Sequence, residues 1–454
     1  MLRFSLRQLA AWTGGSLLGE DVAFDVVSTD TRQLSGGELF VALTGPHFDG
    51  NDFLDQARAA GAGAALVSRA VEVDLPQVLV PDTLQALSRF AAGWRERFDM
   101  PVVGITGSNG KTTVKQLTAA ILACRGPVLA TRGNLNNHIG VPLTLLELRA
   151  EHLSAVIEMG ANHAGEIAAL ADLARPTVGV VTNAGPSHLE GFGSLEGVAE
   201  AKGEMFERLI DGGLAVVNAD DRFAPRWREL ANGRRIVEFG LDADAAFTVA
   251  PGSLQMDAEG SRFLLVGPAG ETEIELAFPG RHNVRNALAA AAAAWGAGAR
   301  LDDIAAGLRQ AEPAQGRLGR RPGLRDSLVV DDTYNANPAS LQAAAEWALT
   351  REVPVWVVLG DMLELGGQAE ALHAQAGEQL AALGIARLFG FGPLSAHAVR
   401  AFGRNGAHFE DIETLIETLR AELSAGATVL VKGSRGMRME RVVAALTESQ
   451  GGEG

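Results

Sequence analysis

The segment from residue 107 to residue 113 combines the residue types that bind phosphate. Glycines let successive backbone N–H groups turn toward a phosphate, a lysine can reach the outer phosphates of a nucleotide, and a threonine hydroxyl can bind Mg²⁺. An apolar run at 101–105 precedes the segment, and an apolar stripe at helical spacing follows it. Strand, glycine loop and helix in this order predict a phosphate-binding loop. Its residues are Gly107, Ser108, Asn109, Gly110, Lys111, Thr112 and Thr113.

The spacing of this loop differs from the usual G-x-x-x-x-G-K-[ST] pattern, because Ile105 stands six positions before Lys111. The segment matches T-G-x-x-G-K-T-T instead. The alternative is a glycine-rich turn between strand and helix that carries an incidental lysine. The strand before the loop and the helix after it favour phosphate binding.

Two further polar residues lie where predicted strands end. Glu158 ends the strand predicted at 154–159, and His188 follows the strand predicted at 177–182. The carboxyl ends of parallel strands form the edge of a sheet where ligands bind. A carboxylate there can complete the Mg²⁺ coordination that Thr112 begins. Each residue alone could equally be a solvated side chain, but their shared edge favours a functional site.

Other segments are ambiguous on their own. Lys202 lies early in a predicted helix, and the residues alone favour an exposed lysine. The segment 280–286 opens a helix and offers planar side chains suited to a purine, although it could equally cap the helix. Polar clusters at 331–338 and 432–436 end predicted strands. Such clusters are more often sites than packing in sheets of this kind.

The positions of these segments predict three domains, at residues 1–82, 83–316 and 317–454. The first mixes short strands with helices, and Asp82 is predicted to cap a helix leading into the second. In the second and third, strands alternate with helices, which predicts parallel sheets covered by helices. The expected fold class is α/β. A small mixed N-terminal domain precedes a central P-loop-type parallel sheet with a small antiparallel meander, and a C-terminal Rossmann-like doubly wound domain follows.

The composition limits the classes of partner. The 454 residues carry a formal net charge of −16, which argues against a nucleic-acid binder or an anionic-membrane binder. The only cysteine, Cys124, rules out an intrachain disulfide, and a reducing, cytoplasmic location is expected. No stretch has the roughly 18 apolar residues of a spanning helix. No interface segment stands out, so a monomer is expected.

Taken together, the motifs resemble those of the Mur ligases, the ATP-dependent amide-bond-forming enzymes of peptidoglycan precursor and cell wall synthesis. The resemblance covers essentially the whole chain. The segments that carry it are 28–32, 37–43, 106–113, 134–142, 158–163, 188–192, 201–204, 280–283, 332–338 and 432–435.

The resemblance implies that the N-terminal domain holds a UDP-sugar, the central domain holds ATP, and the C-terminal domain closes over both. The segment 134–142 and the stretch from Tyr334 to Asn337 point to the member of the family that takes UDP-N-acetylmuramoyl-tripeptide and D-Ala-D-Ala as substrates. ATP would phosphorylate the peptide carboxylate, and the dipeptide amine would attack the acyl phosphate.

The resemblance also implies roles for individual residues. The catalytic residues would be Lys111, Glu158, His188, Lys202 and Arg317. One Mg²⁺ would lie on Thr112 and Glu158, and a second on Glu158, His188 and a carbamylated Lys202. Besides the loop, ATP would contact His282, Asn283, Asn286 and Asp332. The other substrates would contact Ser28, Thr31, Arg32, Asn134, Asn136, Asn137, Asn335, Asn337, Lys432 and Arg435.

The sequence departs from the family pattern in two places. His138 stands where an acidic residue is usual, and Gly436-Met437-Arg438 stands where small residues are common. Both could alter contacts with the peptide. The rival interpretations are another amide ligase of the superfamily, similar to folylpolyglutamate synthetase, and a nucleotide-dependent switch protein. The first fits the N-terminal domain poorly, and the second lacks the guanine-recognition motif.

Overall fold

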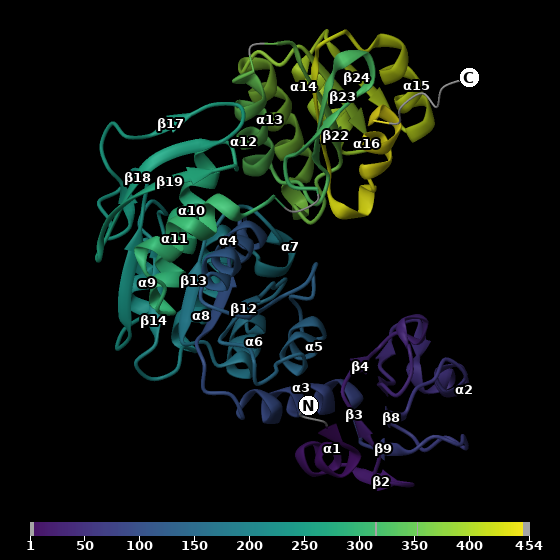
Figure 1. Ribbon diagram of the computed structural model, residues 1–454. Coiled ribbons are helices and arrows are strands. Elements are labelled where there is room, and N and C mark those ends of the chain that lie inside the picture. The colour runs from purple at the N-terminus through teal and green to yellow at the C-terminus, as the bar shows by residue number, and fades with distance from the viewer. Residues whose placement is uncertain (1–3, 314–315, 352, 448–454) are drawn as a thin grey trace, which may run out of the picture.

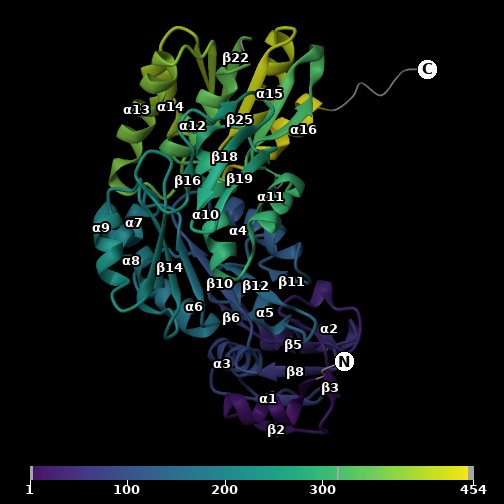
Figure 2. The same cartoon turned by 60° about the vertical axis from the view of Figure 1, so that its left-hand side comes forward.

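A computed structural model describes residues 4–313, 316–351 and 353–447. Three α/β units follow one another along the chain, and Figures 1 and 2 show them arranged from the N-terminal unit to the C-terminal unit. Each unit has its own main sheet. The expected fold class is therefore confirmed, including the mixed N-terminal sheet and the antiparallel meander.

The N-terminal unit contains a five-stranded sheet of order β2-β9-β8-β5-β4, in which β2 alone is antiparallel to its neighbour. Buried apolar side chains from β5 and β8 form its core. The strands are β2 (Ser16–Leu18), β4 (Val27–Ser28), β5 (Leu39–Val41), β8 (Ala64–Val67) and β9 (Gln77–Leu79). The helices are α1 (Leu6–Thr13) and α2 (Leu54–Ala59).

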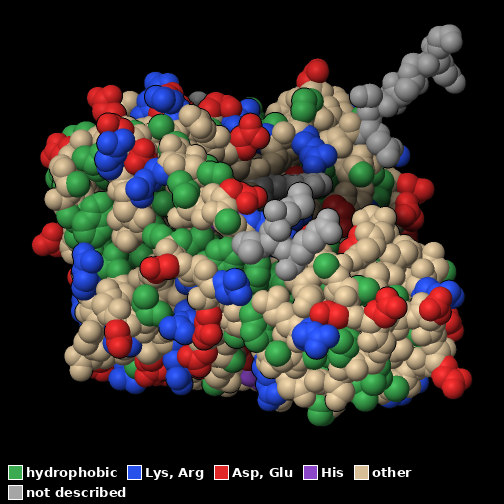
Figure 3. All heavy atoms as spheres, turned by 60° about the horizontal axis from the view of Figure 1, so that its bottom comes forward, with side chains coloured by type: hydrophobic (Ala, Val, Ile, Leu, Met, Phe, Trp, Pro, Cys, Tyr) green, Lys and Arg blue, Asp and Glu red, His purple; other side chains and the backbone are tan. Residues whose placement is uncertain are grey.

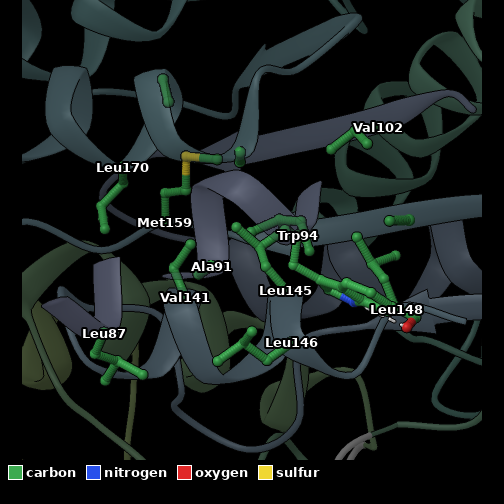
Figure 4. Close-up of a cluster of buried hydrophobic side chains, with 14 of the residues drawn as sticks. Leu87, Ala91, Trp94, Val102, Val141, Leu145, Leu146, Leu148, Met159 and Leu170 are labelled. Atoms are coloured by element: carbon green, nitrogen blue, oxygen red, sulfur yellow. Dashed lines mark hydrogen bonds between the residues drawn. The ribbon is translucent and has the colours of Figure 1, made fainter. Parts of the chain in front are cut away.

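Helix α3 (Thr83–Arg95) joins the first unit to the second. Asp82 caps it as predicted, accepting hydrogen bonds from the backbone N–H groups of Leu84 and Gln85. Its apolar face, with Trp94, packs on α5 (Gly140–Leu146), as Figure 4 shows. The Trp94 indole N–H also donates to the backbone oxygen of Leu148 at 3.1 Å. The helix thus packs on the central unit while following the N-terminal sheet in sequence.

The central unit contains a six-stranded parallel sheet of order β11-β12-β10-β13-β14-β15. Successive side chains of β10 enter two cores on opposite faces of the sheet, Val102 with the α5 side and Val103 with the α4 side. The strands are β10 (Val102–Thr106), β11 (Val128–Ala130), β12 (Ser154–Glu158), β13 (Val178–Val181), β14 (Leu214–Asn218) and β15 (Arg235–Phe239). The edge strands β11 and β15 were not predicted.

Helices cover both faces of this sheet, and a separate antiparallel meander follows β15. The helices are α4 (Lys111–Ala123), α6 (Glu166–Ala174), α7 (Leu189–Phe192), α8 (Leu195–Glu207), α9 (Ala224–Leu230), α10 (Arg281–Gly296) and α11 (Leu301–Gln310). The meander strands are β16 (Thr248–Val249), β17 (Gln255–Met256), β18 (Ser261–Gly267) and β19 (Gly270–Leu276). Their antiparallel pairing agrees with the prediction.

The C-terminal unit has a six-stranded sheet of order β20-β21-β25-β22-β23-β24, parallel except at β20. Cores on both faces confirm the doubly wound prediction. The strands are β20 (Gly319–Pro322), β21 (Leu328–Asp332), β22 (Val355–Gly360), β23 (Arg387–Phe391), β24 (Gly406–Phe409) and β25 (Thr428–Lys432). The helices are α12 (Pro338–Leu349), α13 (Ala369–Ala382), α14 (Ser395–Phe402), α15 (Ile412–Glu422) and α16 (Glu440–Thr447).

The surface carries charges of both signs. Figure 3 shows acidic and basic side chains interspersed over one face of the molecule. Among the described residues, no helix is both long enough and apolar enough to cross a membrane.

Candidate active site

The predicted phosphate-binding loop runs from the end of β10 into the first turn of α4, at the carboxyl edge of the central sheet. Two of its glycines have left-handed backbone angles, with φ of +145° at Gly107 and +81° at Gly110. A Cβ atom at Gly107 would lie 1.9 Å from the Thr182 hydroxyl, and one at Gly110 would lie 2.4 Å from the side-chain oxygen of Asn286. Glycine is therefore required at both positions for conformation and for space.

The segment that follows β13 supports the loop. The Asn183 side-chain oxygen accepts the backbone N–H of Asn109 at 3.0 Å, and the Thr182 hydroxyl donates to the Asn109 backbone oxygen at 2.6 Å. These bonds hold the loop open at the N-terminus of α4, where helix N–H groups favour an anion. Sequence reasoning missed both supporting residues, although Thr182 ends a predicted strand and Asn183 directly follows it.

Lys111 lies at the first turn of α4, where its ammonium points back over the loop. Its Nζ donates to the backbone oxygens of Gly107 at 2.6 Å and Ser108 at 3.4 Å. Burial lowers the pKa of Lys111, the Glu158 carboxylate opposes this shift, and Arg317 adds to it. A phosphate bound in the loop would meet this ammonium directly.

Glu158 ends β12 beside the loop and is 1% exposed. Its Oε1 accepts a hydrogen bond of 2.8 Å from the Asn136 amide, and its Oε2 lies 3.3 Å from Nζ of Lys115. Burial acts to raise the pKa of Glu158, but Lys115, Lys111 and the Asn136 hydrogen bond together hold it below its usual value. The side chain is therefore a carboxylate at neutral pH.

His188 precedes α7 with a left-handed φ of +52°. Its Nδ1 lies 2.6 Å from Oε2 of Glu364, which comes from the C-terminal unit after β22. Burial lowers the pKa of His188 to about 4, with Lys111 and Lys202 adding to the shift. A neutral imidazole is the form that binds metals. Glu364 was missed because its segment carries no recognisable ligand pattern.

Lys202 is buried, 1% exposed, within α8. The prediction from the residues alone, that this lysine is exposed, is therefore wrong. Helix α8 packs the side chain against Phe192, whose ring centroid lies 5.0 Å from Nζ. Burial, with a contribution from Lys111, lowers the pKa of Lys202 to about 7. An amine with this pKa is partly neutral near pH 7 and can add to CO₂ to form a carbamate.

The residues of the predicted metal site fit Mg²⁺ only in part. Among the described residues, no group of three or more His, Cys, Asp and Glu side chains is arranged to hold a metal. Oε2 of Glu158 is nevertheless buried without a well-aligned hydrogen bond, so it can accept a cation. Lys202 could face a metal only as a carbamate, because Mg²⁺ prefers oxygen ligands. Thr112 offers a hydroxyl, which here accepts a hydrogen bond of 3.2 Å from Arg317.

A cavity of about 690 Å³ opens beside the loop, between the central and C-terminal units. Its size suits a nucleotide. Lining residues from the sequence predictions are Asn109, Gly110, Thr113, His282, Asn283, Asn286, Arg317, Asp332 and Lys432. The Asn283 and Asn286 side chains bond to each other at 3.0 Å. Asp332 and Lys432 form a buried ion pair at the far wall.

The C-terminal unit touches the loop at two further points. The Asn337 amide donates to the side-chain oxygen of Asn109 at 2.7 Å, while its own oxygen caps α12. The Arg317 guanidinium lies 4.2 Å from the ring centroid of Tyr334. Asn335 and Arg435, predicted to contact substrate, are exposed, and Arg435 lies 3.5 Å from Glu440. Of the predicted residues of the third unit, two therefore contact the loop (Arg317 and Asn337), two form the ion pair at the cavity wall (Asp332 and Lys432), and two lie at the surface (Asn335 and Arg435).

A second cavity, of about 810 Å³, lies between the N-terminal and central units. Ser28 lines it, and Thr31 and Arg32 lie in the adjoining 3-10 turn. Arg32 is paired with Asp30 at 2.7 Å and is largely exposed. Asn134 and Asn137 are also exposed, and Asn137 bonds to the N-terminus of α5. The structure thus brings Asn136 to Glu158 but leaves Asn134 and Asn137 at the surface.

Family models match most of the chain. The Mur ligase family, catalytic domain, matches residues 23–95, the Mur ligase middle domain matches 105–294, and the Mur ligase, glutamate ligase domain, matches 316–435.

Individual relatives are similar over the full length. The chain is 46% identical to the UDP-N-acetylmuramoyl-tripeptide–D-alanyl-D-alanine ligase of Escherichia coli, over 99% of both chains. Its fold is similar to a crystal structure of MurF from Acinetobacter baumannii, with a TM-score of 0.92, 35% identity, and coverage of 99% of this chain and 100% of that one. MurF ligase from Thermotoga maritima in complex with ADP gives a TM-score of 0.80, 28% identity, and coverage of 92% and 96%.

Proposed function

Since this chain belongs to the Mur ligase family, we propose that it is the ATP-dependent amide ligase that joins D-Ala-D-Ala to UDP-N-acetylmuramoyl-tripeptide in peptidoglycan synthesis. The observation that carries this proposal is the 46% identity, over 99% of both chains, to the E. coli enzyme with that activity in its name. The cavity beside the phosphate-binding loop supports it, because a ligase of this kind must hold a nucleotide next to a second substrate.

ATP binds with its phosphates on the loop and its base against α10. Backbone N–H groups of the loop, Lys111 and the N-terminus of α4 favour the negative charge of the phosphates. Asn283 and Asn286 lie on the cavity wall at α10, where their amides can meet the adenine. His282 and Asp332 line the same cavity. The support for this arrangement is the position of all these side chains around one space.

Two Mg²⁺ ions would neutralise charge on the transferring phosphoryl group. Thr112 and Glu158 would hold one ion, and Glu158, His188 and carbamylated Lys202 would hold the other. The buried Oε2 of Glu158, the lowered pKa of His188 and the lowered pKa of Lys202 support this assignment.

The reaction proceeds in two displacements. A carboxylate oxygen of the tripeptide attacks the γ-phosphorus of ATP, and the bond to ADP breaks. The amine nitrogen of D-Ala-D-Ala then attacks the acyl carbon, phosphate leaves, and the amine loses a proton to give the amide. Lys111 and Arg317 stabilise the charge that develops on the phosphoryl group. The Lys111 ammonium contacts the backbone of the loop, and the Arg317 guanidinium contacts Thr112.

The remaining assignments concern the other substrates and the chain as a whole. The cavity at Ser28 would hold the UDP-sugar, with Thr31 and Arg32 at its edge and Asn134, Asn136 and Asn137 toward the peptide. The dipeptide would meet Asn335, Asn337, Lys432 and Arg435. We also propose domain limits at 1–82, 83–316 and 317–454, a monomeric state, and a cytoplasmic location, where ATP and UDP-linked precursors are found.

Phosphate release tests the proposal. The purified protein should release phosphate from Mg-ATP only when UDP-N-acetylmuramoyl-tripeptide and D-Ala-D-Ala are both present, and the amide product should form in equal amount. The matched Lys111→Ala variant should lose most of this turnover, by about 100-fold or more. Release with folate and glutamate would support the folylpolyglutamate-type alternative. Hydrolysis that ignores the dipeptide would support a nucleotide switch.

A further inference from the structure

Helix α4 carries two lysines one turn apart, and they have different partners. Lys111 Nζ bonds to the backbone oxygen of Gly107, whereas Lys115 Nζ lies 3.3 Å from Oε2 of Glu158. Residues four apart lie on the same face of a helix, so both ammonium groups approach the same edge of the sheet. One lysine therefore lies at the phosphate loop and the other at the carboxylate beside it.

The pair of Lys115 and Glu158 is almost fully enclosed. Their side chains are 6% and 2% exposed. A buried charge without a partner is strongly unfavourable, and each of these groups supplies the other's counter-charge. Glu158 is also the residue whose carboxylate the proposed function assigns to both metal ions. Glu158 is thus both a member of a buried ion pair and a proposed metal ligand.

Each carboxylate oxygen of Glu158 has a partner that fixes the orientation of the side chain. The Asn136 amide holds Oε1 at 2.8 Å, and Lys115 approaches Oε2 without a well-aligned hydrogen bond. A carboxylate oxygen can accept more than one partner, so Oε2 can face a cation while Lys115 remains beside it. Asn136 at Oε1 and Lys115 at Oε2 thus contact Glu158 in the way that outer partners contact a metal ligand.

We propose that Lys115 is a positioning residue, which fixes the Glu158 carboxylate for Mg²⁺ and leaves Lys111 for the phosphates of ATP. The inference rests on the proposed function. Without Lys115, the ammonium of Lys111 is the next cation that acts on Glu158. Attraction between them would draw Lys111 away from the loop and turn the carboxylate away from the metal. Lys115 therefore neutralises Glu158, and Lys111 stays free to bind the phosphates of ATP.

Lys115→Met tests this role, because methionine has a similar length and no charge. The apparent half-saturation concentration for Mg²⁺ in phosphate release should rise roughly tenfold to a hundredfold. The dissociation constant for Mn²⁺, measured by electron paramagnetic resonance with ADP present, should rise in proportion. At saturating Mg²⁺, the KM for D-Ala-D-Ala should stay within about twofold. Lys115→Arg, which keeps the charge on a larger head group, should recover part of the metal affinity.

A purely structural ion pair predicts a different result. Lys115→Met would then lower the melting temperature and leave the Mn²⁺ dissociation constant and the Mg²⁺ requirement within about twofold of the wild type, which overturns the inference. If Lys115→Met does not fold, Lys115→Gln keeps a hydrogen-bond donor without the charge, and it should show the same loss of Mn²⁺ affinity. The double variant Lys115→Met/Glu158→Gln removes both charges and should be at least as stable as Lys115→Met, without recovering Mn²⁺ binding.

Failure of the proposed function is distinguishable from failure of this inference. If the wild-type protein releases no phosphate in response to D-Ala-D-Ala, the proposed function is wrong. The Mn²⁺ and ADP binding experiment on wild type and Lys115→Met still measures what Lys115 does at the metal site.

Discussion

Oε2 of Glu364, on the C-terminal unit, lies 2.6 Å from Nδ1 of His188, on the central unit. Arg317 and Asn337 make two further polar contacts from the same direction, to Thr112 and Asn109. All three contacts reach the carboxyl edge of the central sheet, near the middle of the molecule in Figure 1. The C-terminal unit therefore docks through the residues that surround the proposed reaction site.

Glu364→Gln should weaken this docking. Because His188 is neutral near pH 7 and Glu364 is half-exposed, their contact should contribute no more than about 1 kcal/mol, so we expect kcat/KM to fall by no more than about fivefold. Small-angle scattering should show a larger radius of gyration. The matched control is Glu370→Gln, since Glu370 lies 3.9 Å from His397 within the C-terminal unit itself. Equal effects of the two substitutions would contradict a docking role.

Lys202→Ala should remove a proposed metal ligand, and a small carboxylate should partly replace it. We expect activity to fall by about 100-fold and to recover in part when acetate or formate is added, because either can enter the space that the carbamate leaves. Lys111→Ala should show no such rescue, since its role requires a cation. If Lys202→Ala is as active as the wild type, Lys202 is not a metal ligand and only packs in the core.

Gly110→Ala should weaken nucleotide binding, whereas Gly212→Ala, which introduces similar backbone strain away from the loop, should not. Both Gly110 and Gly212 are left-handed, with φ of +81° and +74°. Alanine at either should cost about 1 kcal/mol of stability. Only at Gly110 would the new Cβ atom meet Asn286, at 2.4 Å, whereas nothing lies within 4 Å at Gly212. Isothermal titration should therefore show about tenfold weaker ADP binding for Gly110→Ala and unchanged binding for Gly212→Ala.

His282 should make folding stability depend on pH. Burial lowers its pKa to about 4 from 6.5, while Asp332 opposes the shift. Below pH 6.5 the unfolded chain binds a proton that the folded protein excludes, so stability is complete above pH 6.5 and declines as the pH falls toward 4. His282→Gln should remove about 1–3 kcal/mol of this decline. Urea unfolding at pH 7 and pH 4.5 measures it, and identical declines in both proteins would contradict the shift.

Several features follow from local sequence because their causes lie within a few residues. The phosphate loop needs glycines at Gly107 and Gly110 for left-handed turns, and Asp82 caps α3 through backbone groups directly after it. The central strands are continuous apolar runs because both of their faces are covered. The edge strands β11, β15, β20 and β24 are less apolar or shorter, so their own residues do not identify them.

The tertiary structure alone decided which charges are buried and with what they pair. Lys202 resembles an ordinary surface lysine in sequence, yet α8 encloses it against Phe192. Lys115 stands at helical spacing among buried residues of α4, but its partner Glu158 lies 43 positions away on another strand. Glu364 reaches His188 only because two separate sheets dock. Burial and pairing of a charge depend on segments remote in the chain, and a local pattern carries no information about them.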